Sequence, residues 1–413
     1  MKPLEEAYRE VLSAINQTEV IELSVFDAGG LVLSAPVLAP HDVPPFTNSA
    51  MDGYAVRAVD IANAPVRLPI LEDVAAGHVA RGVLAPRAAI KIMTGAPLPE
   101  GADTVVRVED TVGVADFVEI LVPASYGSAV REAGGDISTG DLVFPEGERL
   151  TARHLAVLAS LGVQPLVRRR PRVGIISTGD EVLPPDSSTL KSGQIRDTNR
   201  PILHGLLSEL GVAVMDYGIV KDDAELLRSV IERAANENDA IFTSGGVSMG
   251  EYDLVKQVLT QLGGVDLWRV AIQPAKPFAF GLVQGVPLFG LPGNPVSVAV
   301  AFEQFARPAL LHMMGTSTLF RPRVTGILSE SVSTDPDKTV FLRAVAEWGA
   351  GGWTASLSGG QSSNVLTALA RGNCFAVVER GRGDVPCGEV IELEMFTWPE
   401  GRTLEEAEAG THV

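Results

Sequence analysis

Between Val173 and about residue 315, short apolar runs alternate with helical patterns, and this alternation constrains the fold more than any other feature of the chain. VGIIS precedes a helical pattern around PILHGLLSELG, VAVMDYGIV precedes DDAELLRSVIERAANEN, and VPLFGLPGNP precedes SVAVAFEQFARPALLHMMG. Strands that alternate with helices form parallel sheets covered by helices. The sequence therefore predicts an α/β domain over residues 169–318, with a doubly wound, mostly parallel sheet.

The segments on either side of this domain have β-like patterns. Residues 46–145 are rich in Gly and Pro and contain runs such as RLPILEDV and ADTVVRVED, which predicts a β-rich insertion domain. An amphipathic helix is expected within residues 1–45, and a return helix with Thr151 as N-cap and Gly162 as its stop within residues 146–168. Residues 319–400 predict a small C-terminal β-barrel or sandwich, of which we expect the barrel, and residues 401–413 a flexible tail. The whole is a multidomain α/β chain.

Composition narrows the classes of function. A net charge of −18 repels a long polyanion, so no nucleic-acid partner is expected, and the RRRPR cluster at 168–172 is interpreted as a solvated linker. No uncharged apolar run reaches the ~20 residues that cross a bilayer, so no membrane partner is expected. The first residues are acidic where a signal peptide needs a basic start, and a cytoplasmic location is expected. Cys374 and Cys387 fit no metal or redox spacing and are predicted to be buried free thiols, while the six histidines show no ligand spacing.

The loop TSGGVSMGEYD, residues 243–253, follows the apolar run DAIF. Gly245 and Gly246 leave main-chain amides accessible, and Ser248 is suited to cap the helical pattern that follows. The amides at a helix N-terminus attract phosphate groups and other anions. A tight strand-to-helix connection without a ligand explains the same residues equally well.

Other strand ends in the α/β domain carry similar residues. STGDE at 177–181, Asp222 with Asp223, and LPGNP at 291–295 combine Gly, hydroxyl groups and carboxylates. Ligands gather at the carboxyl ends of parallel strands, and this chemistry suits a phosphate with Mg²⁺. The carboxylates to consider are Asp180, Glu181, Asp222 and Asp253, although a capping box of Asp222 with Glu225 also explains Asp222. Neither GxGxxG nor GxxxxGK[ST] is present, which disfavours dinucleotide-binding and P-loop enzymes.

The segment AIQPAKPFAFG, residues 271–281, places Lys276 between two prolines. Proline restricts the backbone and can fix the direction of the amine. A lone lysine is usually a solvated surface charge, but this rigid and otherwise apolar setting favours contact with an anionic ligand.

Seven motifs occur in a fixed order: SAMDGYAVR, IMTGAPLPEGAD, GGDISTGD, STGDE, TSGGVSMGEYD, KPFAFG and GLPGNPVS. Together they resemble the motif set of the MoeA family of molybdopterin molybdenumtransferases, which includes the enzymatic domain of gephyrin. The resemblance implies that adenylylated molybdopterin and molybdate are substrates, that the metal is inserted at the dithiolene sulfurs, and that AMP is released with the help of Mg²⁺. It also implies a homodimer in which the α/β domain of one subunit and the β insertion of the other share an active site.

The same resemblance assigns roles to individual residues. Catalytic roles fall to Asp52, Asp136, Glu181, Asp253 and Lys276. Substrate binding falls to Thr94, Ser177, Thr178, Gly179, Asp180, Thr243, Ser244, Gly245, Gly246, Val247, Ser248, Pro292, Gly293, Asn294 and Pro295. The cation ligands implied are Glu181, Asp222, Asp223 and Asp253. Asp52, Thr94 and Asp136 would reach the site from the partner subunit.

One departure from the family pattern concerns the positively charged side chains. Where the family often has KPGKP, this chain reads QPAKP, so Gln273 replaces a positive residue and Ala275 replaces a glycine. A cation contact to molybdate or phosphate is then lost or moved elsewhere. The sequence does not distinguish molybdate from tungstate.

Two other functions compete with metal insertion. A molybdopterin adenylyltransferase would share the TSGGVS-bearing domain, but a stand-alone enzyme of that type would lack SAMDGYA and the C-terminal β region. A non-catalytic molybdopterin carrier or scaffold would bind the same ligand without releasing AMP. If the chain is the molybdenumtransferase, the adenylyltransferase that supplies its substrate is an expected partner.

Overall fold

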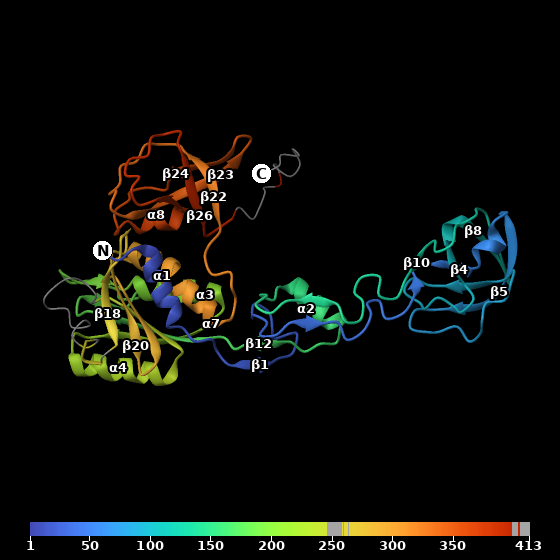
Figure 1. Cartoon of the computed structure of the whole chain (residues 1–413), viewed down its shortest axis with the longest axis horizontal. Coiled ribbons are helices and arrows are strands. Elements are labelled where there is room, and N and C mark those ends of the chain that lie inside the picture. The colour runs from blue at the N-terminus through green and yellow to red at the C-terminus, as the bar shows by residue number, and fades with distance from the viewer. Residues whose placement is uncertain (246–257, 259, 263, 399–403, 405–413) are drawn as a thin grey trace. The chain divides into compact units, whose positions relative to one another are not determined.

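The computed structural model describes residues 1–245, 258, 260–262, 264–398 and 404. The chain forms two compact units (Figure 1). Unit 1 contains Met1–Ile21, Gly30–Val32 and Val167–Val413, and unit 2 contains Glu22–Gly29 and Leu33–Leu166. Most of unit 2 is thus inserted between two stretches of unit 1.

The α/β domain of unit 1 is built on a six-stranded sheet of order β16–β13–β17–β21–β20–β18. Its strands are β13 (Arg172–Thr178), β16 (Ala213–Val220), β17 (Ala240–Ser244), β18 (Val265–Arg269), β20 (Pro277–Val283) and β21 (Val286–Leu291). The first four strands of that order are parallel, whereas β20 and β18 run antiparallel to their neighbours. The predicted mostly parallel sheet is confirmed, with an antiparallel edge.

Helices cover both faces of this sheet (Figure 1). One face packs against α1 (Leu4–Ser13), α3 (Asn199–Leu210), α6 (Pro295–Ala301), a π-helical turn η3 (Phe302–Ala306) and α7 (Arg307–Met313). The other face packs against α4 (Ala224–Glu237). Strand residues alternate between the two cores, as Phe242 faces the first and Ile241 the second. This double covering explains why the strands read as continuous apolar runs.

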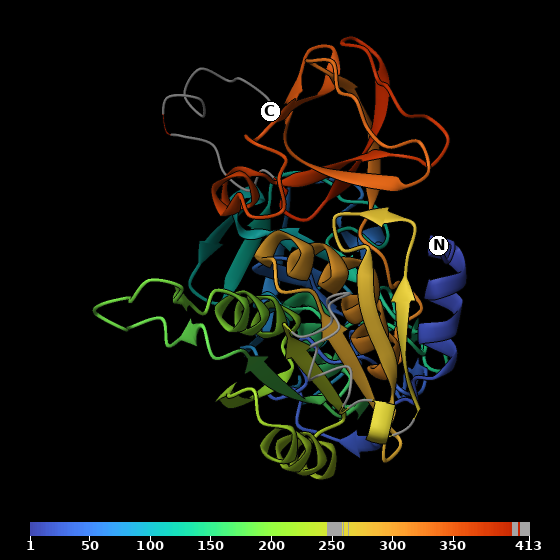
Figure 2. The same cartoon turned by 90° about the vertical axis from the view of Figure 1, so that its left-hand side faces the viewer.

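The C-terminal domain of unit 1 is a closed five-stranded barrel (Figure 2). Its strands are β22 (Arg323–Leu328), β23 (Thr339–Gly349), β24 (Gly352–Leu357), β25 (Cys374–Val378) and β26 (Val390–Met395), with α8 (Leu366–Arg371) before β25. The additional pairing of β23 with β25 closes the ring, which confirms the predicted small barrel. A short strand of the α/β domain, β19 (Ile272–Gln273), pairs with β23 and joins the two domains of unit 1.

Unit 2 is built on a six-stranded sheet of order β7–β4–β6–β5–β9–β8. These strands are β4 (Gly53–Val56), β5 (Val66–Val74), β6 (Ala89–Ile92), β7 (Thr104–Arg107), β8 (Thr111–Val114) and β9 (Phe117–Ile120), with the turns η1 (Ala58–Ile61) and η2 (Val108–Asp110). Two short pairs join β3 (Asn48–Ser49) to β10 (Val130–Arg131) and β2 (Val37–Leu38) to β11 (Leu142–Phe144). Helix α2 (Ala152–Ser160) begins at a capping box of Thr151 with His154, and Gly162 follows its end in a left-handed conformation, as the sequence predicts.

The remaining short strands form two pairs. Strand β1 (Val20–Glu22) pairs with β12 (Leu166–Arg168), and β14 (Val182–Leu183) pairs with β15 (Ile195–Arg196). Within the described part of the chain, no helix combines the length and the apolar character that a membrane crossing requires.

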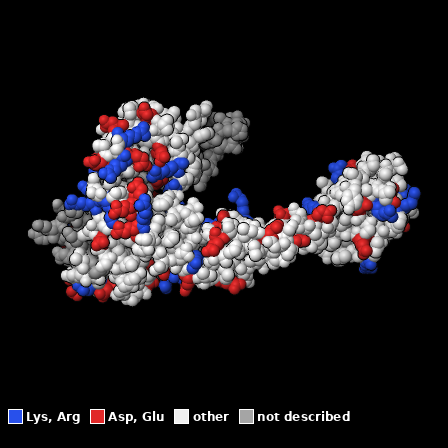
Figure 3. Space-filling view, in the orientation of Figure 1, with Lys and Arg blue, Asp and Glu red and all other residues white. Residues whose placement is uncertain are grey.

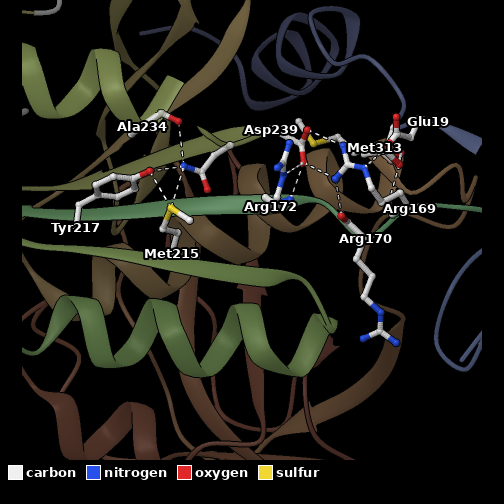
Figure 4. Close-up of polar contacts among 11 residues, drawn as sticks. Glu19, Arg169, Arg170, Arg172, Met215, Tyr217, Ala234, Asp239 and Met313 are labelled. Atoms are coloured by element: carbon white, nitrogen blue, oxygen red, sulfur yellow. Dashed lines mark hydrogen bonds and ion pairs between the residues drawn. The ribbon is translucent and has the colours of Figure 1, made fainter. Parts of the chain in front are cut away.

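The basic cluster RRRPR is more ordered than a solvated linker, so that interpretation is wrong. Arg169 lies between Glu19 and Asp239 (Figure 4) and forms two hydrogen bonds with Asp239, at 2.8 and 2.9 Å. Burial alone would raise the pKa of Asp239, but hydrogen bonds from Arg169 and from the Arg172 N–H outweigh it and hold that pKa below its usual range. The planar guanidinium of Arg169 matches the Asp239 carboxylate and binds it through two hydrogen bonds. The number of charges in the sequence does not reveal such a pairing.

The two cysteines differ from each other. Both are free thiols, and Cys374 in β25 is buried as predicted, with a pKa raised to about 12 by burial. The prediction that Cys387 is buried is wrong, because it lies exposed in the loop before β26, where its Sγ donates to the carbonyl of Ser329. An apolar thiol carries no sequence signal that separates a strand position from a loop position.

Candidate functional site

Three neighbouring strands of the α/β domain end side by side. In the sheet register, Ser177 of β13 pairs with Ser244 of β17, and Ser244 pairs with Leu291 of β21. The STGDE, TSGG and LPGNP segments therefore start from one edge of the sheet, as the sequence predicts. Within the TSGGVSMGEYD loop, Gly246, Val247, Ser248 and Asp253 lie outside the described residues.

Buried hydroxyl groups without a partner mark this edge. Ser177 Oγ, Thr243 Oγ1 and Ser244 Oγ are fully buried, and none has a hydrogen-bond partner among the described residues. A buried polar atom without a partner costs about 1–3 kcal/mol, so a fold tolerates a group of them where a ligand satisfies them. Ser177 and Ser244 pair in register and lie on the same face of the sheet, whereas Thr243 lies on the other face. The two serine hydroxyls are therefore the candidate donors to one anionic or polar ligand.

The backbone at the same edge is tightly arranged. Gly245 has φ +90°, and its N–H donates to the carbonyl of Leu291. A Cβ at Gly245 would lie 3.2 Å from both the carbonyl oxygen and the Oγ1 of Thr178, so a side chain is strained there by conformation and by space. Gly179 also has a positive φ, and a Cβ on it would collide with the Glu181 carboxylate. Glycine is favoured at Gly179 by its backbone conformation, and at Gly245 also by the close approach of Thr178.

Sequence reasoning missed Asn199, the first residue of α3. Its Nδ2 donates to the carbonyl of Gly293 at 2.8 Å, while its buried Oδ1 has no partner among the described residues. Asp197 fixes this turn by accepting from the N–H groups of Asn199 and Arg200 and from Arg200 Nε. The signal was the polar run RDTNR directly before a helical pattern, which is typical of a helix N-terminus.

The LPGNP segment leads into α6. Asn294 is the N-cap residue and Pro295 occupies the first turn, where its missing N–H costs nothing. Asn294 Nδ2 donates to Ser363 Oγ of the barrel, so this loop contacts both domains of unit 1. Pro292 is buried and Gly293 exposed.

The carboxylates predicted as cation ligands separate into two groups. Asp180 and Asp222 lie together, because the Asp222 N–H donates to Asp180 Oδ1 at 3.3 Å. Glu181 folds back over Gly179, and Asp223 accepts the N–H of Leu226 at 2.9 Å as the N-cap of α4. The expected capping box of Asp222 with Glu225 is therefore wrong, because the helix begins one residue later and Leu226 occupies the position that the cap reaches.

No group of three or more His, Cys, Asp or Glu side chains suited to a metal occurs among the described residues. Mg²⁺ usually binds one or two carboxylates together with substrate phosphates and water, so three protein ligands are not required. The exposed pair Asp180 and Asp222, which follow the ends of β13 and β16, fits this mode of binding.

Unit 2 holds Asp52, Thr94 and Asp136. Asp52 Oδ1 accepts from the N–H and from Oγ1 of Thr94, each at 2.7 Å. These two hydrogen bonds, the N–H first, lower the pKa of Asp52 below its usual range. Asp42 and Thr139, also in unit 2, form the same arrangement. Asp136 is exposed, and its N–H donates to the carbonyl of Val43. No contact between Asp52 and Asp136 occurs within the described residues.

The QPAKP segment, residues 273–277, lies where the two domains of unit 1 meet. Gln273 of β19 pairs with Val340 of β23. Ala275 is buried with φ +75°, a conformation that favours glycine, which agrees with the glycine expected there from the family pattern. Lys276 is exposed and lies near Asp335, whose pKa it helps to lower.

A cavity of about 230 Å³ opens beside this segment. Gln273, Pro274, Arg343 and polar residues of the barrel line it, among them Ser331, Ser333, Thr334 and Gln361. Arg343 is 1% exposed, and its Nη2 donates to the carbonyls of Gly360 and Ser362. Its Nε has no partner, and burial is the only influence on its pKa, with no contribution from a described carboxylate.

A buried guanidinium without a counterion is rare because its charge is expensive to remove from water. Burial lowers the pKa of Arg343, but arginine keeps its proton even so. With no acid among the residues that line the cavity, the arrangement suits a small oxyanion. Sequence reasoning did not identify Arg343 as a site residue.

Three family models match the chain in order. They are the MoeA N-terminal region (domain I and II) over residues 2–162, a probable molybdopterin binding domain over residues 174–312, and the MoeA C-terminal region (domain IV) over residues 325–396.

Curated relatives match over nearly their whole length. Molybdopterin molybdenumtransferase 2 of Mycobacterium tuberculosis (strain ATCC 25618 / H37Rv) is 37% identical over 404 residues, 95% of this chain and 99% of that protein. Molybdopterin molybdenumtransferase of Haemophilus influenzae is 35% identical over 406 residues, 96% of this chain and 99% of that protein. Two crystal structures of the molybdopterin biosynthesis MoeA protein of Pyrococcus horikoshii have a TM-score of 0.81 at 34% and 28% identity, and each match covers 96% of this chain and 100% of that one. These matches confirm the family resemblance seen in the motifs.

Proposed function

Because the chain belongs to the MoeA family, we propose that it inserts molybdate into adenylylated molybdopterin and releases AMP, as a transferase of molybdenum cofactor biosynthesis. The pair of buried, unpartnered hydroxyls on Ser177 and Ser244, neighbours on one face of the sheet, carries this proposal. Hydroxyl donors at the carboxyl ends of parallel strands suit the phosphate groups of the adenylylated substrate. Thr178, Gly179, Gly245 and the LPGNP segment shape the same edge.

Molybdate, the second substrate, would bind in the cavity at Arg343. The guanidinium supplies a charge that is already desolvated, and charge-assisted hydrogen bonds to an oxyanion are strong in such a setting. Lys276 lies in the same QPAKP segment as the cavity-lining Gln273 and Pro274. We propose that its ammonium stabilises the negative charge of the transition state.

Asp180 and Asp222 would hold Mg²⁺ together with substrate phosphate. When bound, the cation neutralises phosphate charge as the pyrophosphate bond breaks. Glu181 and Asp253 are further candidates, whereas the capping role of Asp223 makes it the weakest of the predicted ligands. The residues of this chain position the phosphate through hydroxyl and amide donors.

The active site would be shared between two subunits of a homodimer. Asp52, Thr94 and Asp136 of unit 2 would reach the partner's α/β domain, with Asp52 kept ionised by the hydrogen bonds from Thr94. A cytoplasmic reaction, with an adenylyltransferase as the partner that supplies the substrate, completes the proposal.

The direct test is molybdate-dependent AMP release from adenylylated molybdopterin. The Ser244→Ala variant should raise the KM for the adenylate by about 10- to 100-fold, since a hydrogen bond to a charged group contributes about 1.5–3 kcal/mol. Ser208→Ala is the matched control, because Ser208 on α3 bonds only the carbonyl of its own helix at His204. Equal effects of the two substitutions would contradict the assignment of the strand ends.

Two outcomes would replace this function. If the protein forms the adenylate from molybdopterin and ATP, it is an adenylyltransferase. If it binds the adenylate tightly but releases no AMP when molybdate and Mg²⁺ are added, it is a carrier. We expect neither, because a chain that matches both MoeA regions outside the binding domain has parts that a stand-alone adenylyltransferase does not need.

A further inference from the structure

A lysine of the barrel lies at the edge of the Arg343 cavity. Lys338, just before β23, places its Nζ 3.5 Å from Oε1 of Gln273, which lines the cavity. The Lys338 side chain is 17% exposed, so the ammonium is largely removed from water. The pairing of β19 with β23, with Ile272 opposite Thr339, brings Gln273 close to Lys338, which directly precedes β23.

Asp335 holds this lysine. Its Oδ2 lies 2.5 Å from Lys338 Nζ, and the hydrogen bond from Lys338 is the main reason that the pKa of Asp335 lies below its usual range. Lys276 acts on the same carboxylate at longer range. Two ammonium groups therefore surround one carboxylate, and Arg343 adds a third positive charge without a counterion. Among the residues that line the cavity, Arg343 is the only charged one, while the carboxylates of Asp384 and Glu330 accept hydrogen bonds from the lining residues Ser333 and Leu357.

Gln273 supplies no positive charge to an anion, because its amide is neutral. Its Oε1 accepts a hydrogen bond from Lys338. We propose that Lys338 supplies the second cationic contact to the oxyanion in the Arg343 cavity, and that Asp335 holds the ammonium ready at its edge. The chain thus provides, from the barrel, the charge that position 273 lacks. This inference rests on the proposed function, since it concerns the oxyanion substrate of the same site.

Lys338 is a better candidate for this role than Lys276. Lys276 is exposed, so its charge is screened by water, whereas Lys338 is largely buried and directly contacts a residue of the cavity wall. Because the lysine side chain is flexible, its ammonium would exchange the Asp335 carboxylate for a bound oxyanion. The ion pair with Asp335 limits the cost of keeping the ammonium there while the cavity holds no anion.

The test measures binding of sodium molybdate by titration calorimetry to the full-length protein. Lys338→Gln should weaken binding roughly tenfold, since one charge-assisted hydrogen bond is lost. Lys338→Arg, which keeps the charge, should bind within about threefold of the natural protein. Lys91→Gln is the matched control, because Lys91 forms a comparable pair with Asp73, at 2.9 Å, in unit 2. Lys91→Gln should leave molybdate binding unchanged.

A second variant tests the position of the charge rather than its presence. Adding Gln273→Lys to Lys338→Gln returns an ammonium to the same edge of the cavity, so this double variant should recover most of the lost affinity. Failure of this rescue, or equal binding by Lys338→Gln and the natural protein, would overturn the role of Lys338.

The Arg343→Met variant separates this inference from the proposed function. If Arg343→Met loses molybdate binding while retaining its thermal unfolding transition, but Lys338→Gln binds normally, the oxyanion cavity stands and only Lys338 is excluded. If Arg343→Met, folded by the same criterion, binds molybdate as the natural protein does, the cavity itself is not the oxyanion site.

Discussion

At the scale of single residues, charge is controlled by hydrogen bonds at Asp52 and by burial at Arg343. Asp52 is exposed, and two hydrogen bonds from Thr94 hold it ionised. Arg343 is buried, and only backbone carbonyls accept from it among the described residues. In the first arrangement, the hydrogen bonds from Thr94 keep the Asp52 carboxylate charged at low pH. In the second, burial has already removed water from the Arg343 guanidinium, so it can bind an anion without further desolvation.

Thr94→Val tests the first arrangement. The substitution removes the hydroxyl donor and keeps the backbone N–H, so the pKa of Asp52 should rise toward its ordinary value. A depressed pKa stabilises the fold where Asp52 is ionised, and this contribution is lost as the pH falls through that pKa, so the variant should lose it at a higher pH than the natural protein. The measurement is an NMR titration of the Asp52 carboxyl carbon in protein labelled at aspartate.

The Asp42 and Thr139 pair in the same unit is the control for this titration. Thr139→Val should raise the pKa of Asp42, which its hydrogen bonds with Thr139 lower, and leave Asp52 unchanged. If Thr94→Val leaves the Asp52 titration unmoved, the hydroxyl does not contribute to keeping that carboxylate charged.

At the scale of helices and strands, the alternation of apolar runs predicted the parallel part of the sheet but not its antiparallel edge. Strands β20 and β21 form a hairpin through Gln284 and Gly285, both with positive φ, as in a tight two-residue turn. The pair QG is a weaker hairpin signal than NG or DG, which explains why the sequence did not indicate it. The parallel strands are connected by helices, and the helical spacing of apolar residues in those connecting segments made the strands recognisable in the sequence.

Arg343 shows why part of the site was not predictable from sequence. In TVFLRAVAEW, Val340, Leu342 and Ala344 alternate with it and face the barrel core, so the pattern places Arg343 on the solvent side of a half-buried strand. That outer side is covered instead, and its neighbour Phe341 belongs to the core of the α/β domain. Strand pattern predicts which residues share a face, whereas burial of that face depends on contacts between domains.

The start of α4 gives a prediction at this scale. Asp223→Ala removes the side chain that accepts the Leu226 N–H, and should lower the free energy of unfolding by about 1 kcal/mol. Asp222→Ala removes no cap and should cost less than about 0.5 kcal/mol. Urea unfolding of both variants measures the difference. A larger loss for Asp222→Ala would restore the capping box inferred from the sequence.

At the scale of the whole molecule, a chain of hydrogen bonds ties the barrel to the α/β domain. Tyr8 of α1 donates to Gln304 of the π-helical turn, Gln304 donates to Glu394 of β26, and Arg323 of β22 donates to Glu394. Burial raises the pKa of Glu394, while Arg323 opposes that effect. Acidic and basic side chains lie side by side over the barrel (Figure 3), where Arg323 also pairs with Glu379. This network helps to fix the barrel against α1 and the π-helical turn of the α/β domain.

A shared active site makes a quantitative prediction for mixed dimers. If Asp52 of one subunit serves the site that contains Arg343 of the other, then Asp52→Ala and Arg343→Met homodimers should both lack AMP release. Random mixing of equal amounts makes about half of the dimers mixed, and each mixed dimer holds one intact site and one doubly altered site, so about a quarter of the natural activity should return. Differently tagged subunits, purified through both tags, isolate the mixed dimers and should show about half of the natural activity per dimer. If purified mixed dimers are as inactive as the parent homodimers, both residues serve a site within one subunit. The proposal that unit 2 completes the site of the partner subunit would then be wrong.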